Sequence, residues 1–286
     1  MIESTFQLAR GIGPRRERRL WDAGIARWSD FAARDATIAG AGALPPAAAR
    51  TLRAAVDDAA AALAAGDADR LAALVPSREH WRLFDAFAAD AAYLDIETSD
   101  DVVGFAGISA IGVWDRRGPT LLLGGRDLDA FVELAAGWKL LVTFNGLSFD
   151  VPILRRAFPD WRPPLAHIDL RHVLERLGHG GGLKAIERNL HTLGLRRPAH
   201  LDGIDGWDAA WLFRRGRDGD RDALRVFAEY NLCDAIHLRT LMAWAYNELV
   251  AAETAAAPAL RGAARTVDVP ARGDALYDVS KILLAL

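Results

Sequence analysis

The spacing of hydrophobic positions along the chain changes near residue 81. Before this point, apolar residues recur at helical spacing. Residues 6–31 predict two helices joined by a tight turn, and Pro14 suits the first turn of the second helix, where its missing N–H costs nothing. An alanine-rich stretch, 46–74, predicts further helix with a break at Gly66. The first part of the chain is therefore predicted to be a small all-α N-terminal module.

Beyond residue 81, short apolar runs alternate with helical patterns. The runs predict strands at 91–96, 103–114, 119–124, 139–144 and 165–170. The segments between and after them predict helices at 127–137, 150–158, 170–177, 182–193, 206–214 and 219–252. Three adjacent strands followed by helix-separated strands predict an α/β fold with a mixed β-sheet flanked by helices.

Composition narrows the classes of protein that fit this pattern. The chain has 286 residues, of which 51% are hydrophobic, so it can bury a sizeable core. Its longest apolar runs are far shorter than the ~20 residues that cross a bilayer, and its start shows no secretory signal. Cys233 is the single cysteine, which excludes an intramolecular disulfide. These features predict a soluble cytoplasmic protein that does not bind membranes.

The net charge alone does not indicate which partner the protein binds. The net charge of −3 argues against a protein that coats nucleic acid electrostatically. Only three of the 35 basic residues are lysines, and arginine suits bidentate phosphate contacts. The positions of individual charged residues therefore matter more than their sum.

A first acidic motif stands at the end of a buried strand, in 91-AAYLDIETSD-100. Asp95 and Glu97 are two residues apart, so in a strand their side chains point to the same face. Their repulsion would raise the pKa of one carboxyl unless a positive charge lies between them. Three arrangements fit: one acid is protonated, the strand end faces water, or a cation bridges the two.

A second motif, 144-FNGLSFDVPIL-154, follows the strand predicted at 139–144. Asn145 and Gly146 suit a turn, and Asp150 falls in the first turn of the next helix. Asp150 can cap that helix or hold a ligand with the same oxygens. Asn145 can contact a substrate or fix the turn.

A third motif, 230-YNLCDAIHL-238, lies in the long predicted helix. Tyr230 and Asp234 are four residues apart and share a helical face that also carries apolar residues, so this face points inward. An inward aspartate needs a partner. A simple hydrogen-bonded pair and a functional site both satisfy that need.

Together the three motifs resemble the DEDD superfamily of ribonuclease-H-like 3′–5′ exonucleases, tyrosine subtype. D-x-E on a strand, N-x-x-x-F-D after a strand and Y-x-x-x-D on a late helix follow one another in the order typical of that superfamily. The YprB-type branch is similar in further segments, namely 81-WRLFDAF-87, 167-HIDLRHVLERLG-178 and 182-GLKAIERNL-190. The resemblance covers roughly residues 80–250.

The resemblance implies a two-metal nuclease that acts on a single-stranded end of DNA or RNA as a 3′–5′ exonuclease. Two divalent cations, Mg²⁺ or Mn²⁺, would neutralise the carboxylates and clamp the reacting phosphodiester. Tyr230 would orient the attacking water, and Asp95 would bridge the two ions. The implied metal ligands are Asp95, Glu97, Asp150 and Asp234, and these four with Tyr230 form the implied catalytic set.

Two rival functions remain at this stage. A nucleic-acid-binding protein on the same fold can have negligible hydrolysis. A glycoside hydrolase also uses two carboxylates, but these flank a bond some 5–9.5 Å apart, whereas Asp95 and Glu97 leave one strand side by side. The second rival is the weaker one.

Two further residues have a structural and a functional interpretation each. Lys184 follows three glycines at a predicted helix start, where it can hold a substrate phosphate or lie on the surface. Asp169 ends a predicted strand, where it can cap the next helix or join the ligands.

The N-terminal turn at Gly11 and Gly13 resembles a helix-hairpin-helix, a motif whose backbone amides and basic second helix bind a phosphate without reading sequence. The arginines that fit this binding role are Arg15, Arg16, Arg18 and Arg19. The alternative is a structural helical pair with a solvated basic face.

The predicted organisation has four parts. They are a helix-hairpin-helix-like module at 1–35, an alanine-rich connector at 36–80, a ribonuclease-H-like domain at 81–255 and a tail at 256–286 that packs on the body of the protein.

Overall fold

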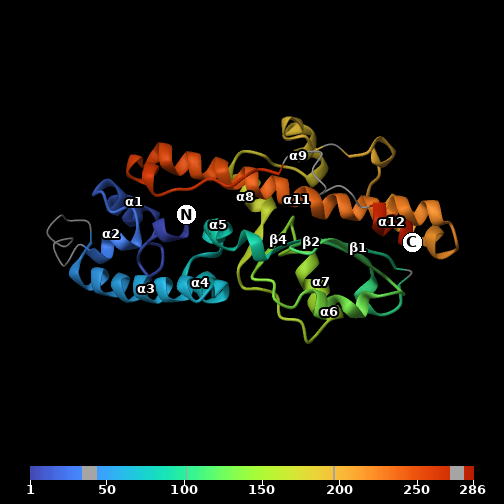
Figure 1. The fold of residues 1–286 in the computed structure, drawn as a ribbon, viewed down its shortest axis with the longest axis horizontal. Helices are drawn as coiled ribbons and strands as arrows, with labels where there is room; N and C mark the ends of the chain where they lie inside the picture. The colour runs from blue at the N-terminus through green and yellow to red at the C-terminus, as the bar shows by residue number, and fades with distance from the viewer. Residues whose placement is uncertain (34–43, 101, 196, 271–279) are drawn as a thin grey trace. The chain divides into compact units, whose positions relative to one another are not determined.

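The computed structural model describes residues 1–33, 44–100, 102–195, 197–270 and 280–286 (Figure 1). The chain forms two compact units. Unit 1 comprises residues 1–89, 164–168 and 244–268, and unit 2 comprises 90–163, 169–243 and 269–286. Each unit draws on segments that are distant in the sequence, so the units differ in extent from the four predicted parts.

Unit 1 is mainly helical in the residues that the structure describes. Its helices are η1 (Ile2–Ser4), α1 (Pro14–Asp22), α2 (Trp28–Ala33), α3 (Pro46–Ala64), α4 (Ala68–Leu74), η3 (Ser77–Leu83), α5 (Phe84–Phe87), most of η4 (Ala88–Asp90), the end of α11 (Arg221–Ala256) and η9 (Pro258–Gly262). It also contains the first two residues of strand β5 (His167–Asp169). The predicted break between α3 and α4 is present, and Gly66 there adopts a left-handed φ of +64°. The predicted N-terminal all-α part is thus confirmed.

The helix predicted before the first turn is wrong. Residues 6–13 form turns and extended backbone, and only η1 precedes them. The buried carboxylate of Glu17 holds this segment, because it accepts hydrogen bonds from the Thr5 hydroxyl at 2.6 Å, the Phe6 N–H at 2.8 Å and the Gln7 side chain at 2.7 Å. These bonds satisfy polar groups that a helix would otherwise satisfy.

Five strands form one mixed sheet in the order β3-β2-β1-β4-β5. Their bounds are β1 (Ala91–Thr98), β2 (Ile108–Asp115), β3 (Gly118–Leu123), β4 (Leu140–Thr143) and β5 (His167–Asp169). The central strand β1 pairs antiparallel with β2 and parallel with β4. The predicted α/β fold with a mixed sheet is therefore confirmed.

Helices cover both faces of the sheet in unit 2 (Figure 1). On one face, Leu94 and Ile96 of β1 pack with Phe131 and Leu154. On the other face, the apolar cluster includes Phe213 and Phe227. The helices described for this part of the chain are η5 (Phe105–Gly107), η6 (Leu128–Ala130), α6 (Phe131–Leu134), α7 (Asp150–Ala157), α8 (Leu170–Arg176), α9 (Leu183–Asn189), η7 (His191–Leu193), η8 (Ala199–Leu201), α10 (Gly206–Arg217), α11 (Arg221–Ala256) and α12 (Ser280–Ala285).

Two predicted elements are shorter than expected. The strand predicted at 103–114 begins only at Ile108. Phe105 and Ala106, which precede it, have left-handed φ angles of +43° and +55°, and a strand excludes such angles. The helix predicted at 127–137 is reduced to η6 and the four residues of α6.

The predicted tail, 256–286, is described only in part, since residues 271–279 lie outside the described residues. At its end, Ile282 and Leu283 of α12 pack against Leu232 and Ile236 of α11. The Arg225 guanidinium donates a hydrogen bond to the Leu283 carbonyl at 3.2 Å.

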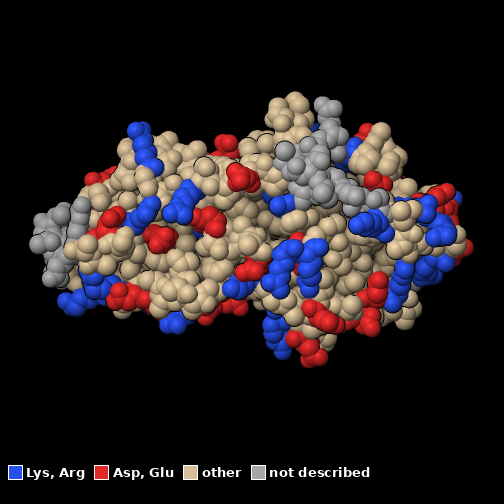
Figure 2. Space-filling model, viewed as in Figure 1, with Lys and Arg blue, Asp and Glu red and all other residues tan. Residues whose placement is uncertain are grey.

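Charged side chains of both signs are interspersed on the face that Figure 2 shows. This distribution agrees with the small net charge of −3. On this face, lysine and arginine side chains gather only in small local groups (Figure 2).

Candidate metal centre

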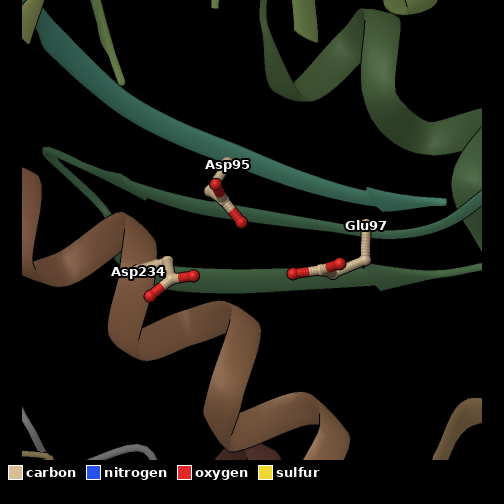
Figure 3. A group of neighbouring side chains, drawn as sticks. All are labelled: Asp95, Glu97 and Asp234. Carbon is tan, nitrogen blue, oxygen red and sulfur yellow. The ribbon is translucent and has the colours of Figure 1, made fainter. Parts of the chain in front are cut away.

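Three acidic side chains converge between the central strand and the long helix α11 (Figure 3). Leu94 and Ile96 of β1 enter one core, so the alternation of the strand turns Asp95 and Glu97 to the opposite face. Asp234 of α11 meets them there. One carboxylate oxygen from each of the three residues lies within 4.8 Å of the others.

A glycine in the neighbouring strand allows this close approach. Gly112 is the register partner of Asp95, and a Cβ atom on it would lie 2.4 Å from Oδ1 of Asn231 in α11. Nδ2 of Asn231 donates to Oδ2 of Asp95 at 2.8 Å and to its carbonyl at 3.3 Å. Asn231 therefore positions Asp95, a role that the sequence analysis missed.

Asp150 is buried at the first residue of α7 but lies outside the group of three. Its Oδ1 accepts a hydrogen bond from the Ile96 N–H at 3.1 Å. The pairing of β1 with β4 ends at Tyr93, three residues before Ile96. The Asp150 carboxylate therefore takes the place of a strand partner for the Ile96 N–H. The N-cap of α7 is Phe149, without a side-chain cap bond, so the capping alternative for Asp150 is not what the structure shows.

The electrostatics of the centre favour an added positive charge. Burial, with the neighbouring Asp234 and Glu97, raises the pKa of Asp95 well above its usual range. Burial and then Asp234 raise the pKa of Glu97 to about 8, and burial raises the pKa of Asp150 to about 7, with Asp169 and Asp234 adding to it. The protein alone therefore disfavours full ionisation of these acids.

An arginine partly offsets the charge of Asp234. Arg197 donates to Oδ1 of Asp234, and its Nε lies 2.8 Å from Oε2 of Glu187. Burial works to lower the pKa of this guanidinium, but Asp234 and Glu187 outweigh it, and the pKa is raised. No sequence pattern indicated Arg197, because it follows a segment without periodic pattern. Glu187 was not predicted either, and its Oε1 lies 2.8 Å from Nδ1 of His237.

Tyr230 is held by the lysine that the sequence singled out. Nζ of Lys184 donates to the Tyr230 hydroxyl and, at 2.6 Å, to the Ile204 carbonyl. Burial, with Asp234 and Glu97, raises the pKa of Tyr230. The phenol therefore keeps its proton at neutral pH, and this proton can be donated to a third group.

A cavity of about 310 Å³ borders these residues. Its lining includes three cationic side chains, Lys184, Arg188 and Arg197, and two acidic ones, Glu187 and Asp202. His191 and apolar residues complete it. Its volume is at the lower end of the range typical of small-molecule sites.

Asn145 and Asp169 build the turn behind Asp150. Asn145 has a left-handed φ of +64°, and its N–H donates to Oδ1 of Asp169 at 2.7 Å. The same carboxylate accepts from the Arg171 N–H and thereby caps α8, as the structural alternative for Asp169 predicted. Oδ1 of Asn145 accepts from Arg171 at 2.9 Å, so in this structure Asn145 fixes the turn.

The N-terminal residues singled out by the sequence lie in unit 1. Gly11 has a φ of +87°, and its carbonyl accepts from Arg16 at 2.7 Å. Arg18 lies 3.0 Å from Asp22, whereas Arg15 and Arg19 are exposed.

The sheet order, the flanking helices and the acidic group on the central strand define a ribonuclease-H-like α/β protein. A model of the RNase_H superfamily matches residues 92–246, which is more than half of the chain. The chain belongs to the RNase_H superfamily. No curated protein and no solved structure matches it significantly.

Among the described residues, no helix has both the length and the apolar character needed to cross a bilayer. The RNase_H superfamily consists largely of hydrolytic nucleases, so the family points to nuclease-type chemistry on nucleic acid.

Proposed function

We propose that this protein is a metal-dependent nuclease of the DEDD type, tyrosine subtype and YprB-type branch, that removes nucleotides from a 3′ end. One observation carries the proposal. Within an RNase_H superfamily fold, Asp95, Glu97 and Asp234 present oxygens within 4.8 Å of one another.

The donor set fits hard divalent cations. Carboxylate oxygens are the ligands that Mg²⁺ and Mn²⁺ prefer, and the raised pKa values show that the protein leaves acidic charge uncompensated. Asp95, Glu97 and Asp234 would hold the metal, with Asp150 beside them. When bound, two divalent cations would stabilise the charge that develops on the phosphate and on the leaving 3′ oxygen.

The side chains around the acids have separate tasks. The Tyr230 hydroxyl accepts from Lys184 and so has its own proton available to orient the attacking water. Lys184, Arg188 and Arg197 line the cavity against two acids, Glu187 and Asp202, and this small excess of positive charge suits a phosphate or a nucleotide. Asn145 would act on substrate only indirectly, through the turn that it fixes.

A second candidate function is nucleic-acid binding with negligible hydrolysis. The specific observation in its favour is that Arg197 already neutralises Asp234 and that Asp150 is bonded to the Ile96 N–H. In a binding protein these contacts would persist in the presence of divalent cations.

The deciding experiment is a product ladder from 5′-labelled single-stranded DNA and RNA with Mn²⁺. We expect progressive shortening from the 3′ end by the wild type. Asp95→Ala and Asp234→Ala should lose about a thousandfold or more in rate, since metal ions supply several kcal/mol of transition-state stabilisation. Asp160→Ala, at an exposed aspartate of unit 2, is the matched control.

The outcomes separate the candidates. A wild type that binds both strands without shortening them supports the binding protein. Equal rates for wild type and the two aspartate variants would show that a different group cleaves the strand.

We further propose that the N-terminal module, residues 1–35, binds phosphates with its exposed arginines. Replacing Arg15 and Arg19 by alanine should weaken strand binding and flatten the dependence of log Kd on log salt concentration by about one to two units. Arg50→Ala with Arg70→Ala, exposed on other helices of unit 1, is the charge-matched control. An unchanged salt slope would assign the module to packing alone.

A further inference from the structure

Helix α10 carries large apolar side chains on two different faces. One face is buried: Ala209 and Phe213 join the apolar cluster of α11, and the rings of Phe213 and Phe227 are 5.2 Å apart. On the other face, Trp207 is 87% exposed and Trp211 is 50% exposed. The other tryptophans of the chain are buried or half-buried. The apolar cluster holds the buried face of the helix, and neither exposed tryptophan belongs to that cluster.

The exposed face is both aromatic and basic. Trp207, Trp211 and Arg215 follow one another at intervals of four residues, so they form one stripe along the helix. The Arg215 guanidinium lies 4.7 Å from the centre of the Trp211 ring and also pairs with Asp220, which follows the helix, so Arg214 and Arg217 supply the remaining charge. Arg214 and Arg217 are also exposed in the last turn, and α10 contains a single acidic residue, Asp208.

This stripe begins close to the metal centre. Lys184, which holds Tyr230, donates to the carbonyl of Ile204, three residues before Trp207. Asp205 then caps α10 by accepting from the Trp207 N–H at 2.8 Å. Phe213 and Tyr230 belong to one apolar cluster, so α10 is fixed to the same side of α11 that carries the catalytic tyrosine.

We infer that the outer face of α10 binds the single strand that leads away from the metal centre, with bases stacked on Trp207 and Trp211. The inference rests on the proposed nuclease function. Stacking on aromatic side chains and contacts between arginine and phosphate are the two means by which proteins hold single strands without reading their sequence.

The geometry favours a single strand over a duplex. Trp207 and Trp211 are ~6 Å apart along the helix axis at 1.5 Å per residue, farther than the ~3.4 Å spacing of stacked bases in a duplex strand. Each indole therefore takes a separate, unstacked base. Only a single strand offers such base faces, and its phosphates complement the arginines of the last turn.

The test measures the affinity for fluorescein-labelled single strands of 4 and 20 nucleotides, as DNA and as RNA, in an Asp95→Asn background that prevents hydrolysis. Three double variants at Trp207 and Trp211 are compared, with alanine, phenylalanine and leucine at both positions. Phenylalanine retains a stacking surface, whereas leucine retains apolar area without an aromatic face. Leu284→Ala, at another exposed apolar residue of unit 2, is the control.

We expect the double alanine variant to raise Kd for the 20-mer about tenfold or more, because the variant loses the stacking of two bases. The phenylalanine pair should stay within about threefold of the parent protein, and the leucine pair should resemble alanine. The gain in affinity from the 4-mer to the 20-mer should shrink in the alanine variant. DNA and RNA should respond alike, since every base has an aromatic face.

A Kd for the 20-mer that is unchanged in the alanine variant would overturn the inference and leave the tryptophan pair as a surface for a protein partner. A leucine pair equal to the parent would exclude stacking. Because binding is measured without hydrolysis, the result does not depend on whether the wild type cleaves strands in the product-ladder experiment. Thermal unfolding by circular dichroism verifies that each variant is folded.

Discussion

Both units of the molecule bury a group of acidic side chains, but they treat the charge differently. In unit 1, the acids surround a single arginine, Arg82, which is only 1% exposed. Its guanidinium lies 2.8 Å from Glu79, 3.2 Å from Glu253 and 3.8 Å from Glu17. These three glutamates outweigh the effect of burial and raise the pKa of Arg82.

In unit 2, no lysine or arginine among the described residues forms an ion pair with Asp95. Its carboxylate accepts a bond from the neutral amide of Asn231, and its pKa is raised well above the usual range by burial and by Asp234. Arg197 and Lys184 reach the group from its rim. Arg82 thus neutralises the buried acids of unit 1 permanently, whereas the acids around Asp95 are suited to a cation that binds and leaves.

Removing the buried cation of unit 1 should have the largest effect. Arg82→Met should lower the free energy of unfolding by ~3–5 kcal/mol, because the change leaves buried glutamates without their cation. Urea unfolding measures the loss. Arg78→Met, at an exposed neighbour whose side chain lies 3.5 Å from Glu79, should change it by less than about 0.5 kcal/mol. Equal losses would show that the burial of Arg82 is irrelevant.

Added metal should sharpen the contrast in unit 2. At 100 times its Kd, Mn²⁺ should stabilise the wild type by ~2.7 kcal/mol relative to the protein in EDTA. Asp95→Asn should lose most of this gain, whereas Arg78→Met should keep it. The measurement is the thermal midpoint with and without Mn²⁺. If Mn²⁺ does not change the thermal midpoint of the wild type, the acidic group of unit 2 does not bind this cation.

Loss of the amide that positions Asp95 should have an intermediate effect. Asn231→Leu removes the bonds to the Asp95 carboxylate and carbonyl. Partners of metal ligands typically contribute 10–100-fold to affinity or activity, so kcat should fall by about that factor and the Mn²⁺ concentration for half-maximal rate should rise. Asn247→Leu, at a helical asparagine of unit 1 bonded to Val267, controls for the change of residue type. If the Mn²⁺ dependence stays the same, Asn231 has only a packing role.

The pH dependence of stability tests the protonation of Glu97 in the metal-free protein. Folding raises the pKa of Glu97 to about 8, so the metal-free folded state binds more protons than the unfolded state above pH ~4.5, and stability falls as pH rises towards 8. The difference in unfolding free energy between Glu97→Gln and wild type in EDTA should therefore grow by at least about 1.4 kcal/mol, the equivalent of one pKa unit, between pH 5 and 8. A constant difference would mean that Glu97 titrates normally.

Periodicity predicted the parts of the site that lie on regular elements. Two-residue alternation in β1 places Asp95 and Glu97 on one face, and the four-residue interval places Tyr230 and Asp234 on one side of α11. The start of α7 at Asp150 follows from the turn residues before it.

The remaining features depend on tertiary contacts that no local pattern reports. The bond from Asn231 to Asp95 depends on the strand register opposite Gly112, and Arg197 reaches Asp234 from an irregular segment. Phe105 adopts a left-handed conformation that neither its residue type nor its neighbours predict.

Gly112 would connect packing to ion selection at the proposed metal centre without touching an ion. A methyl group at this position would press on Asn231 at 2.4 Å, so the amide or the whole helix would have to shift. Such a shift would lengthen the reach between the strand acids and Asp234, and hard cations differ in the oxygen distances that they accept, about 2.1 Å for Mg²⁺ against 2.3–2.6 Å for Ca²⁺. At the proposed metal centre, the missing side chain of Gly112 would thus set the distance between the strand acids and Asp234, and its replacement would change which ion the centre accepts.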